Sequence, residues 1–314
     1  MIALLRSELL RMRSRRLVSV LVAAALAGIL VTSAILTVRS HKPGAADLAL
    51  ATQMYQEQLQ HCLNGDYGVP PDELGGLTLK QWCHRNVTLE QYQGVSAGSR
   101  FTLTLSGLPD VLLGTSFLML LMGVLIGASS IGAEFSAGTF TTLLTWEPRR
   151  VRVMIARLLI VAITVAAFTL FIQSALASML STVAALRGST AGTGPPWLHH
   201  VVSTIGRMTL MAAVISFLGF AVATIGRSTA AALGGLFVYL ALFENLLRGL
   251  RPSIAPWLLS TNVIAYMTGH EISLDVSNSA PIVVGVAQGL AITCLYVGAL
   301  VLLAGVVLRA RDVN

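Results

Sequence analysis

Six long runs of apolar residues, almost free of charge, are the feature that most limits how this chain can fold. Each run has 18 to 28 residues, and about 20 apolar residues are enough for a helix to cross the hydrocarbon core of a bilayer. Backbone groups in a bilayer must bond to one another, so such runs fold as helices. We therefore predict an all-α polytopic membrane protein with six transmembrane helices. The runs are 17–38, 111–131, 158–185, 208–225, 230–247 and 282–308.

Residues 1–16, before the first run, combine five arginines with an apolar stripe. The apolar members recur at helical spacing, at Ile2, Leu5, Leu9 and Met12. This pattern predicts an amphipathic elbow helix that lies on the membrane surface. A cleaved secretory signal peptide is the alternative. The 22 apolar residues of 17–38 exceed the 7–15 of a signal-peptide core, so we interpret them as the first span.

Charge between the runs predicts their orientation, because cytoplasmic loops carry an excess of arginine and lysine. With the N-terminus inside, 12 of the 21 basic residues and 4 of the 14 acidic residues face the cytoplasm, which gives +8 inside and −1 outside. We therefore predict a multi-pass plasma-membrane protein with both termini cytoplasmic and membrane lipid around it. The net charge of +7 then reflects topology. No basic domain indicates a nucleic-acid partner.

Two polar segments fall outside the membrane in this orientation. The segment 39–110 is predicted to form a small extracytoplasmic domain. The segment 248–280 is a second outer loop, whose apolar part, 254–267, is a candidate re-entrant or interfacial helix.

The extracytoplasmic domain contains Cys62 and Cys83. Two thiols in an oxidising compartment usually form a disulfide, so we predict a Cys62–Cys83 bond. The alternative is a metal site in which the adjacent His61 and His84 are ligands.

The membrane runs contain few groups that could bind a coupling ion. A charge in mid-membrane costs about 2.5–3.5 kcal/mol on insertion scales and persists mainly where function needs it. Four of the runs (111–131, 158–185, 208–225 and 282–308) hold no charged residue or histidine. Gln173, Glu244 and Gln288 are the candidate residues of a substrate pathway. We infer that an ion bound among these helices does not drive the protein.

The second run contains small residues at four-residue spacing. Gly123 is followed by Gly127, and Ala128 by Gly132. Such a stripe allows helices to approach closely. Packing within the chain and a specific dimer or pathway face are the two interpretations.

The chain has no P-loop for binding ATP. That motif places a lysine after a glycine-rich turn, whereas Lys42 and Lys80, the only lysines, lie in the extracytoplasmic segment. We predict no catalytic residue and no metal or cofactor on this chain. Any ATPase must be a separate protein.

The cytoplasmic segment 132–157 is a candidate docking loop. Gly138 and Pro148 bracket a short predicted helix, 139–145. Thr139 is placed to cap the N-terminus of this helix. Pro148 suits the first turn of the following helix. A short helix held between two spans can pass a partner's motion into the membrane. An ordinary topology loop with arginines is the alternative.

Three parts of the chain resemble ABC-2 type transporter permeases. The first part is Glu134-x3-Gly138-Thr139-x3-Leu143-Leu144-Thr145-x2-Pro148-Arg149-Arg150, followed by Ala156-Arg157-Leu158-Leu159. The second is Leu5-Arg6-x-Glu8-Leu9-x-Arg11, and the third is Gly226-Arg227-Ser228-Thr229-Ala230-Ala231. Arg157 stands where the family often has lysine. The segment 39–110 has no counterpart in this resemblance.

The resemblance implies the permease subunit of an ATP-binding cassette exporter for a hydrophobic or amphipathic substrate, such as a drug, an antibiotic or a lipid. It implies a dimer with a second or homologous permease and a separate ATPase subunit that holds ATP and Mg²⁺. The loop would be the coupling helix, with a coupling surface of Glu134, Gly138, Thr139, Leu143, Leu144, Pro148, Arg149 and Arg150. The alternative is a membrane sensor or assembly factor that does not transport and acts through its extracytoplasmic domain.

Overall fold

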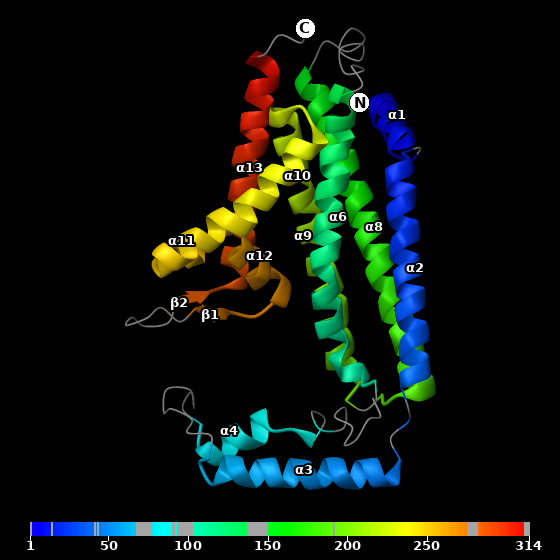
Figure 1. The fold of residues 1–314 in the computed structure, drawn as a ribbon, viewed down its shortest axis with the longest axis vertical. Coiled ribbons are helices and arrows are strands. Elements are labelled where there is room, and N and C mark those ends of the chain that lie inside the picture. Colours follow the sequence, from blue (N-terminus) through cyan, green and yellow to red (C-terminus); the bar gives the residue numbers. More distant parts are fainter. Residues whose placement is uncertain are drawn as a thin grey trace. The chain divides into compact units, whose positions relative to one another are not determined.

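The structure is a computed structural model that describes residues 2–13, 15–40, 42, 44–66, 77–89, 92, 103–136, 150–190, 192–274 and 282–310. Within these residues, six helices are long and apolar enough to cross a membrane (Figure 1). The prediction of a mainly helical polytopic membrane protein is therefore confirmed in the number of long apolar helices and in their helical content. The chain forms two compact units. One comprises Met1–Leu26, Val111–Ser174 and Val202–Asn314, and the other Ala27–Asp110 and Ala175–Val201.

The helices follow the apolar runs in order. Before the fourth span they are α1 (Ile2–Arg13), α2 (Arg16–Arg39), α3 (Ala45–Leu63), α4 (Leu79–Asn86), the 3₁₀ turn η1 (Leu105–Gly107), α6 (Leu108–Ser136) and α8 (Arg150–Arg187). The fourth span is α9 (Pro195–Gly226). The fifth consists of α10 (Thr229–Val238), the π-helical segment η2 (Tyr239–Phe243) and α11 (Glu244–Leu250). The sixth is α13 (Val286–Ala310).

The helix of the fourth span, α9, is longer than predicted. It begins at Pro195 rather than at Met208, because proline suits the first turn of a helix, where its missing N–H is not needed. The extension brings Arg207 into the fourth apolar helix. The run 208–225 itself holds no charged residue, and Arg207 lies directly before it in the same helix.

The segment before the sixth apolar helix contains a pair of short strands that the sequence analysis missed. Strand β1 (Ile272–Leu274) pairs antiparallel with β2 (Ile282–Val284), with Ser273 opposite Val283. The sixth helix consequently begins at Val286 and not at Ile282. The β-branched residues of β2 favour extended backbone. A two-stranded hairpin thus joins an otherwise all-α fold.

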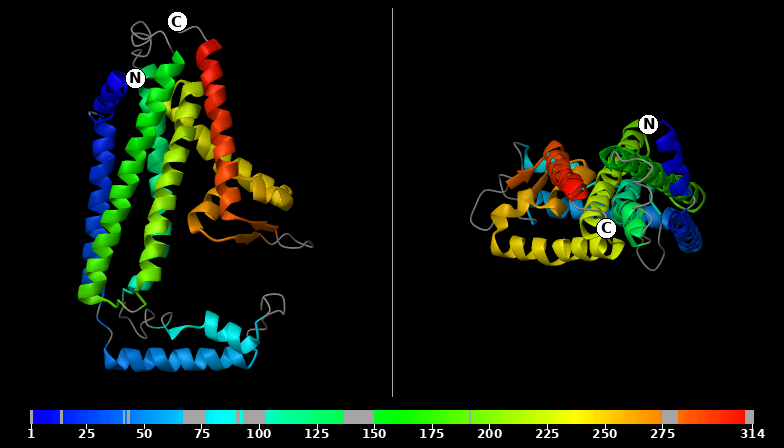
Figure 2. Two further views of the ribbon diagram at one scale, coloured as in Figure 1. Left: turned by 180° about the vertical axis from the view of Figure 1, so that it is seen from behind. Right: turned by 90° about the horizontal axis from the view of Figure 1, so that it is seen from above.

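The candidate re-entrant piece 254–267 folds as two short helices. These are the 3₁₀ helix η3 (Pro252–Trp257) and α12 (Leu259–Thr268). Helix α12 packs against α13, where a Cβ atom at Gly289 would come within 2.5 Å of the Asn262 carbonyl oxygen. Both views in Figure 2 show α12 beside the start of α13. The position of α12 relative to a membrane remains a prediction.

The small residues of α6 pack within the chain. A Cβ atom at Gly127 would overlap the Ser216 carbonyl of α9, and one at Gly219 would overlap the Val124 carbonyl of α6. A Cβ atom at Gly132 would come within 2.6 Å of the Thr229 nitrogen at the start of α10. The stripe is therefore a contact surface inside the first unit.

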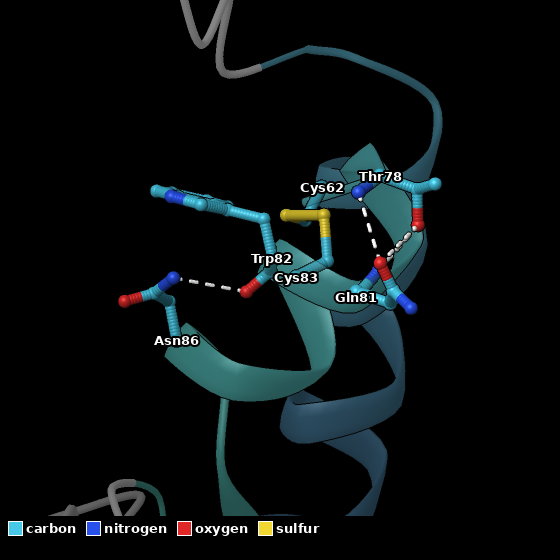
Figure 3. Close-up of a disulfide and its surroundings, with 6 residues drawn as sticks. All are labelled: Cys62, Thr78, Gln81, Trp82, Cys83 and Asn86. Carbon is cyan, nitrogen blue, oxygen red and sulfur yellow. Dashed lines mark hydrogen bonds between the residues drawn. A yellow bond between two sulfur atoms is a disulfide. The ribbon is translucent and has the colours of Figure 1, made fainter. Parts of the chain in front are cut away.

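The second unit contains the disulfide that the sequence predicted (Figure 3). Cys62 of α3 is bonded to Cys83 of α4 across a Cα–Cα distance of 5.9 Å, and neither side chain is exposed. Partly buried apolar residues surround the bond, namely Tyr55, Leu59, Leu79, Trp82 and Tyr92. At the start of α4, the Thr78 hydroxyl accepts the Gln81 N–H at 3.3 Å, and the Gln81 side chain accepts the Thr78 N–H at 3.0 Å.

The histidines beside the two cysteines are not gathered around a metal site in the structure. His61 lies 2.7 Å from the Asp66 carboxylate, and His84 is exposed. Among the described residues, no group of three histidine, cysteine, aspartate or glutamate side chains is close enough to hold a metal ion.

Candidate functional site

A cluster of charged side chains joins α1, the start of α2, α6 and α8. Glu8 and Arg11 come from α1, Arg15 precedes α2, Glu134 lies two residues before the end of α6, and Arg157 lies in the second turn of α8. All five belong to the first unit. We call these five residues the ionic cluster.

Arg157 is the centre of the ionic cluster. Its guanidinium lies 2.5 Å from Glu134 through Nη2 and 3.5 Å from Glu8 through Nε. It therefore contacts one carboxylate from α6 and one from α1. Arg11 adds an ion pair to Glu8 at 3.4 Å, one helical turn further along α1.

Arg15 links the start of α2 to the end of α6. Its Nη2 lies 3.2 Å from the Glu134 carboxylate and donates to the Ser130 carbonyl at 3.0 Å, while Nη1 donates to the Ser129 carbonyl. A cation near the C-terminal end of a helix is also favoured by the helix dipole. Arg15 and Arg157 thus bind the two oxygens of one carboxylate.

The ionic cluster is largely buried. Glu8 is 5% exposed and Arg157 is 3% exposed. Burial lowers the pKa of Arg15, and the Glu134 carboxylate opposes that shift. An isolated buried charge costs several kcal/mol, whereas a charge with close partners is compensated. Each charge in the cluster therefore depends on the others, and the cluster ties α1, the start of α2, α6 and α8 together.

The ionic cluster brackets the loop that was predicted to bind a partner. Helix α6 ends at Ser136 and α8 begins at Arg150, so Glu134 and Arg157 stand at the two ends of the intervening segment. The sequence interpretation placed Glu134 on the coupling surface, and the structure pairs it with Arg15 and Arg157. Of Arg150, only the backbone is described, as the first residue of α8. The other predicted coupling residues, Gly138, Thr139, Leu143, Leu144, Pro148 and Arg149, lie outside the described residues.

Gln173, a candidate for the substrate pathway, is fully buried between α6, α8 and α9. Its side-chain oxygen accepts the Thr115 hydroxyl at 3.3 Å, and its amide donates to the Leu112 carbonyl at 3.4 Å. The amide also lies 3.6 Å from the Met208 sulfur. In this conformation Gln173 is a hydrogen-bonded residue of the helix core.

Glu244, the second pathway candidate, begins α11 after the π-helical segment and is 2% exposed. Both carboxylate oxygens accept the Ser260 N–H at 3.2 Å, so Glu244 bonds a free N–H in the first turn of α12. Gln288, the third candidate, is exposed on α13. No hydrogen bond of the described residues joins the three candidates to one another.

Sequence reasoning did not identify the ionic cluster as a site. It noted Glu8 and Arg157 as matches to a family pattern and as inward-facing charges, and it noted Arg15 as one of the five arginines of the segment 1–16. The available signal was that Arg157 directly precedes the apolar run 158–185, where an unpaired charge is costly. Which acid pairs with which base depends on how α1, α6 and α8 meet, and no sequence spacing gives that.

The fold and the ionic cluster define a multi-pass, mainly helical membrane protein with a buried ion network at one of its loops. In comparisons with known proteins, no family model matched the chain, and no curated protein was significantly similar to it.

Proposed function

We propose that the chain is the membrane-spanning permease subunit of an ATP-binding cassette exporter, driven by a separate ATPase subunit. The observation that carries the proposal is the ionic cluster, which joins both ends of the 137–149 loop to the N-terminal helix. The six apolar helices provide the membrane domain, and the resemblance of the loop to ABC-2 type permeases provides the assignment of class.

The ionic cluster supports a mechanical role for the loop. A partner that pushes on residues 137–149 displaces the end of α6 and the start of α8 together, because Glu134 and Arg157 are in contact. Arg157 also contacts Glu8, so α1 must follow or the buried pairs must break. Breaking a buried pair by removing one partner costs about 3–5 kcal/mol. Motion of the loop is therefore transmitted as motion of three helices.

The proposal assigns the energy source to a partner. ATP and Mg²⁺ are held by the ATPase, since the sequence of this chain contains no P-loop. A second permease copy, or a homologous permease, completes the pathway. The cargo is hydrophobic or amphipathic, in keeping with apolar helices that hold few polar groups. This chain provides the conduit and the docking loop, and no catalytic residue.

Copurification from the native membrane tests the proposal. The tagged chain, extracted in a mild detergent, should bring down a protein with a P-loop and ATPase activity. Replacement of residues 139–145 by glycine and serine should release that protein. A matched control carries Gln53→Ala and Gln60→Ala, two exposed positions on α3, and should retain it.

The opposite pattern would contradict the proposal. If no ATPase copurifies, and the α3 changes instead of the loop change release the bound proteins, the chain acts through its extracytoplasmic domain. That result would favour the sensor or assembly factor.

A further inference from the structure

Two cavities of the first unit adjoin α12. The larger has a volume of about 410 Å³ and lies between α6, α9, α10, η2 and α12. The smaller has a volume of about 210 Å³ and lies between α11, η3, α12 and β1. Ile264 lines both cavities. Figure 1 shows the elements that surround them.

The larger cavity has the chemistry and the shape for a hydrocarbon chain. Its lining is almost entirely apolar, with residues such as Phe117, Leu240 and Met267. Along α6 the lining runs from Leu113 to Val124, which is about 16 Å at 1.5 Å per residue. Gly114 leaves further room, because a Cβ atom there would meet nothing within 4 Å. Apolar cavities of this size bind apolar molecules.

The smaller cavity adds a cation next to the hydrocarbon site. Arg248 lines it, and its guanidinium donates to the Ser260 hydroxyl at 3.1 Å and to the Thr261 hydroxyl at 3.2 Å. Ser260 lines the larger cavity and Thr261 the smaller one. Arg248 therefore stands where the two cavities meet.

The charge of Arg248 is not neutralised by an ion pair within the described residues. The nearest acid along the helix, Glu244, directs both carboxylate oxygens at the Ser260 N–H. A guanidinium has five N–H donors, and the hydrogen bonds of Arg248 to the described residues come from Nη2. The remaining donors can bind a carboxylate or a phosphate.

We propose that the two cavities bind one anionic, single-chain amphiphile, with the hydrocarbon chain in the larger cavity and the acidic headgroup at Arg248. The pairing of an elongated apolar cavity with an arginine at its junction selects this class over neutral hydrocarbons and over cations. Its role as a cargo site rests on the proposed function. Binding itself needs no ATPase.

Photolabelling of the full chain in lipid nanodiscs tests the site. The probe is a photoreactive analogue of palmitate, and palmitate and hexadecanol, which have chains of equal length, compete for it. Arg248→Gln should weaken competition by palmitate at least about tenfold, because hydrogen bonds to a charged group contribute that much. Competition by hexadecanol should not change. Arg309→Gln, at an exposed arginine near the end of α13, is the matched control.

A second variant tests the apolar cavity. Gly114→Leu should weaken both competitors about tenfold, since excluding even two methylene groups from the cavity has that effect. Gly298→Leu is the control, because Gly298 lies on α13, lines neither cavity and also has open space at its Cβ position. The proposal is overturned if Gly114→Leu leaves labelling unchanged, or if Arg248→Gln weakens palmitate and hexadecanol equally.

The source of the amphiphile is distinguished by adding the ATPase. Release of the photoreactive palmitate on ATP addition assigns the site to cargo. Retention through many ATP turnovers assigns it to a resident membrane lipid, and in both cases the site stands. If no ATPase partner exists but the binding results hold, the proposed function fails and the amphiphile site survives.

Discussion

Arg157 is a buried charged residue whose contacts link three helices. It lies in the second turn of α8, is 3% exposed and contacts carboxylates of two other helices. Arginine suits such a position because its planar guanidinium can bind two carboxylates at once and stays charged. Removing it would leave Glu8 and Glu134 in a buried site without their shared cation.

Arg157→Gln should therefore destabilise the protein by about 3 kcal/mol, the cost of breaking a buried ion pair from one side. Thermal unfolding of the purified chain in nanodiscs measures this. Arg152→Gln, at a half-buried arginine in the same helix, is the control and should change stability by less than about 1 kcal/mol. Adding Glu134→Gln to Arg157→Gln should recover part of the loss. If Arg157→Gln unfolds at the same temperature as the wild type, the ionic cluster does not stabilise the fold.

At the scale of elements, the contact between α6 and α9 is set by glycine. Gly127 and Gly219 lie against carbonyl groups of the opposite helix, so a methyl group at either position meets backbone that cannot rotate away. Close approach of this kind increases van der Waals contact between helices in a bilayer. Helix α6 also contains Gly114, where an added Cβ atom would meet nothing within 4 Å.

The two glycines of α6 should respond in opposite ways to alanine. We expect Gly127→Ala to destabilise the protein by about 1–3 kcal/mol through overpacking. Gly114→Ala should be neutral or stabilising by up to about 1 kcal/mol, because alanine has the higher helix propensity. Thermal unfolding of both variants in the same lipid checks the pair. Equal melting temperatures would contradict the close α6–α9 contact.

The disulfide makes a third prediction, for α3 and α4. Cys83→Ser should raise the hydrogen-exchange rates of both helices. The disulfide closes a loop of about 21 residues, which lowers the entropy of the unfolded chain and so stabilises the folded state by about 3 kcal/mol. Cys294→Ala, at the exposed free cysteine of α13, should leave exchange in α3 and α4 unchanged. Unchanged exchange in Cys83→Ser would mean that the apolar cluster around the bond holds the helices without it.

Some elements could be predicted from the sequence and others could not, for physical reasons. The span from Arg16 to Arg39 was predicted within one residue, since apolar length and flanking charge define it. The early start of α9 at Pro195 was missed because His199, His200 and Arg207 interrupt its hydropathy. The β1–β2 hairpin was missed because Ile282, Val283 and Val284 are apolar like the helix that follows them, so hydropathy alone does not separate them from the sixth run.

The candidate site shows the same limit. The disulfide partners were predictable because two cysteines in one polar segment leave one pairing. Glu134 was identified from a local motif. Its partners Arg15 and Arg157 come from the start of the chain and from α8, so their meeting depends on tertiary packing. The pairing of Glu244 with the Ser260 N–H, across a turn that contains η3, was hidden for the same reason.

At the scale of the whole molecule, the distribution of charge predicts one orientation. The predicted inner segments carry +8 and the outer segments −1. Translocating many arginines is unfavourable, so both termini should be cytoplasmic. The Cys62–Cys83 bond is in keeping with this orientation, since disulfides persist in oxidising compartments.

Labelling of intact cells checks the orientation. The experiment uses the Cys294→Ala variant, which lacks the third thiol. After reduction, a membrane-impermeant maleimide should label Cys62 and Cys83 from outside. A C-terminal tag should be protected from external protease until the cells are permeabilised. Labelling of the two cysteines only after permeabilisation would reverse the topology and place the 137–149 loop outside, where no ATPase could dock.

The measurement that tests the central claim most directly is ATP hydrolysis by the copurified ATPase in proteoliposomes, with and without this chain. We predict that the chain stimulates hydrolysis, and that Glu134→Gln assembles with the ATPase but loses most of the stimulation because the loop no longer moves the helices as one body. A rate of hydrolysis that is the same with the chain, without it and with the variant would contradict the claim. So would solute movement by the isolated chain on an ion gradient without nucleotide.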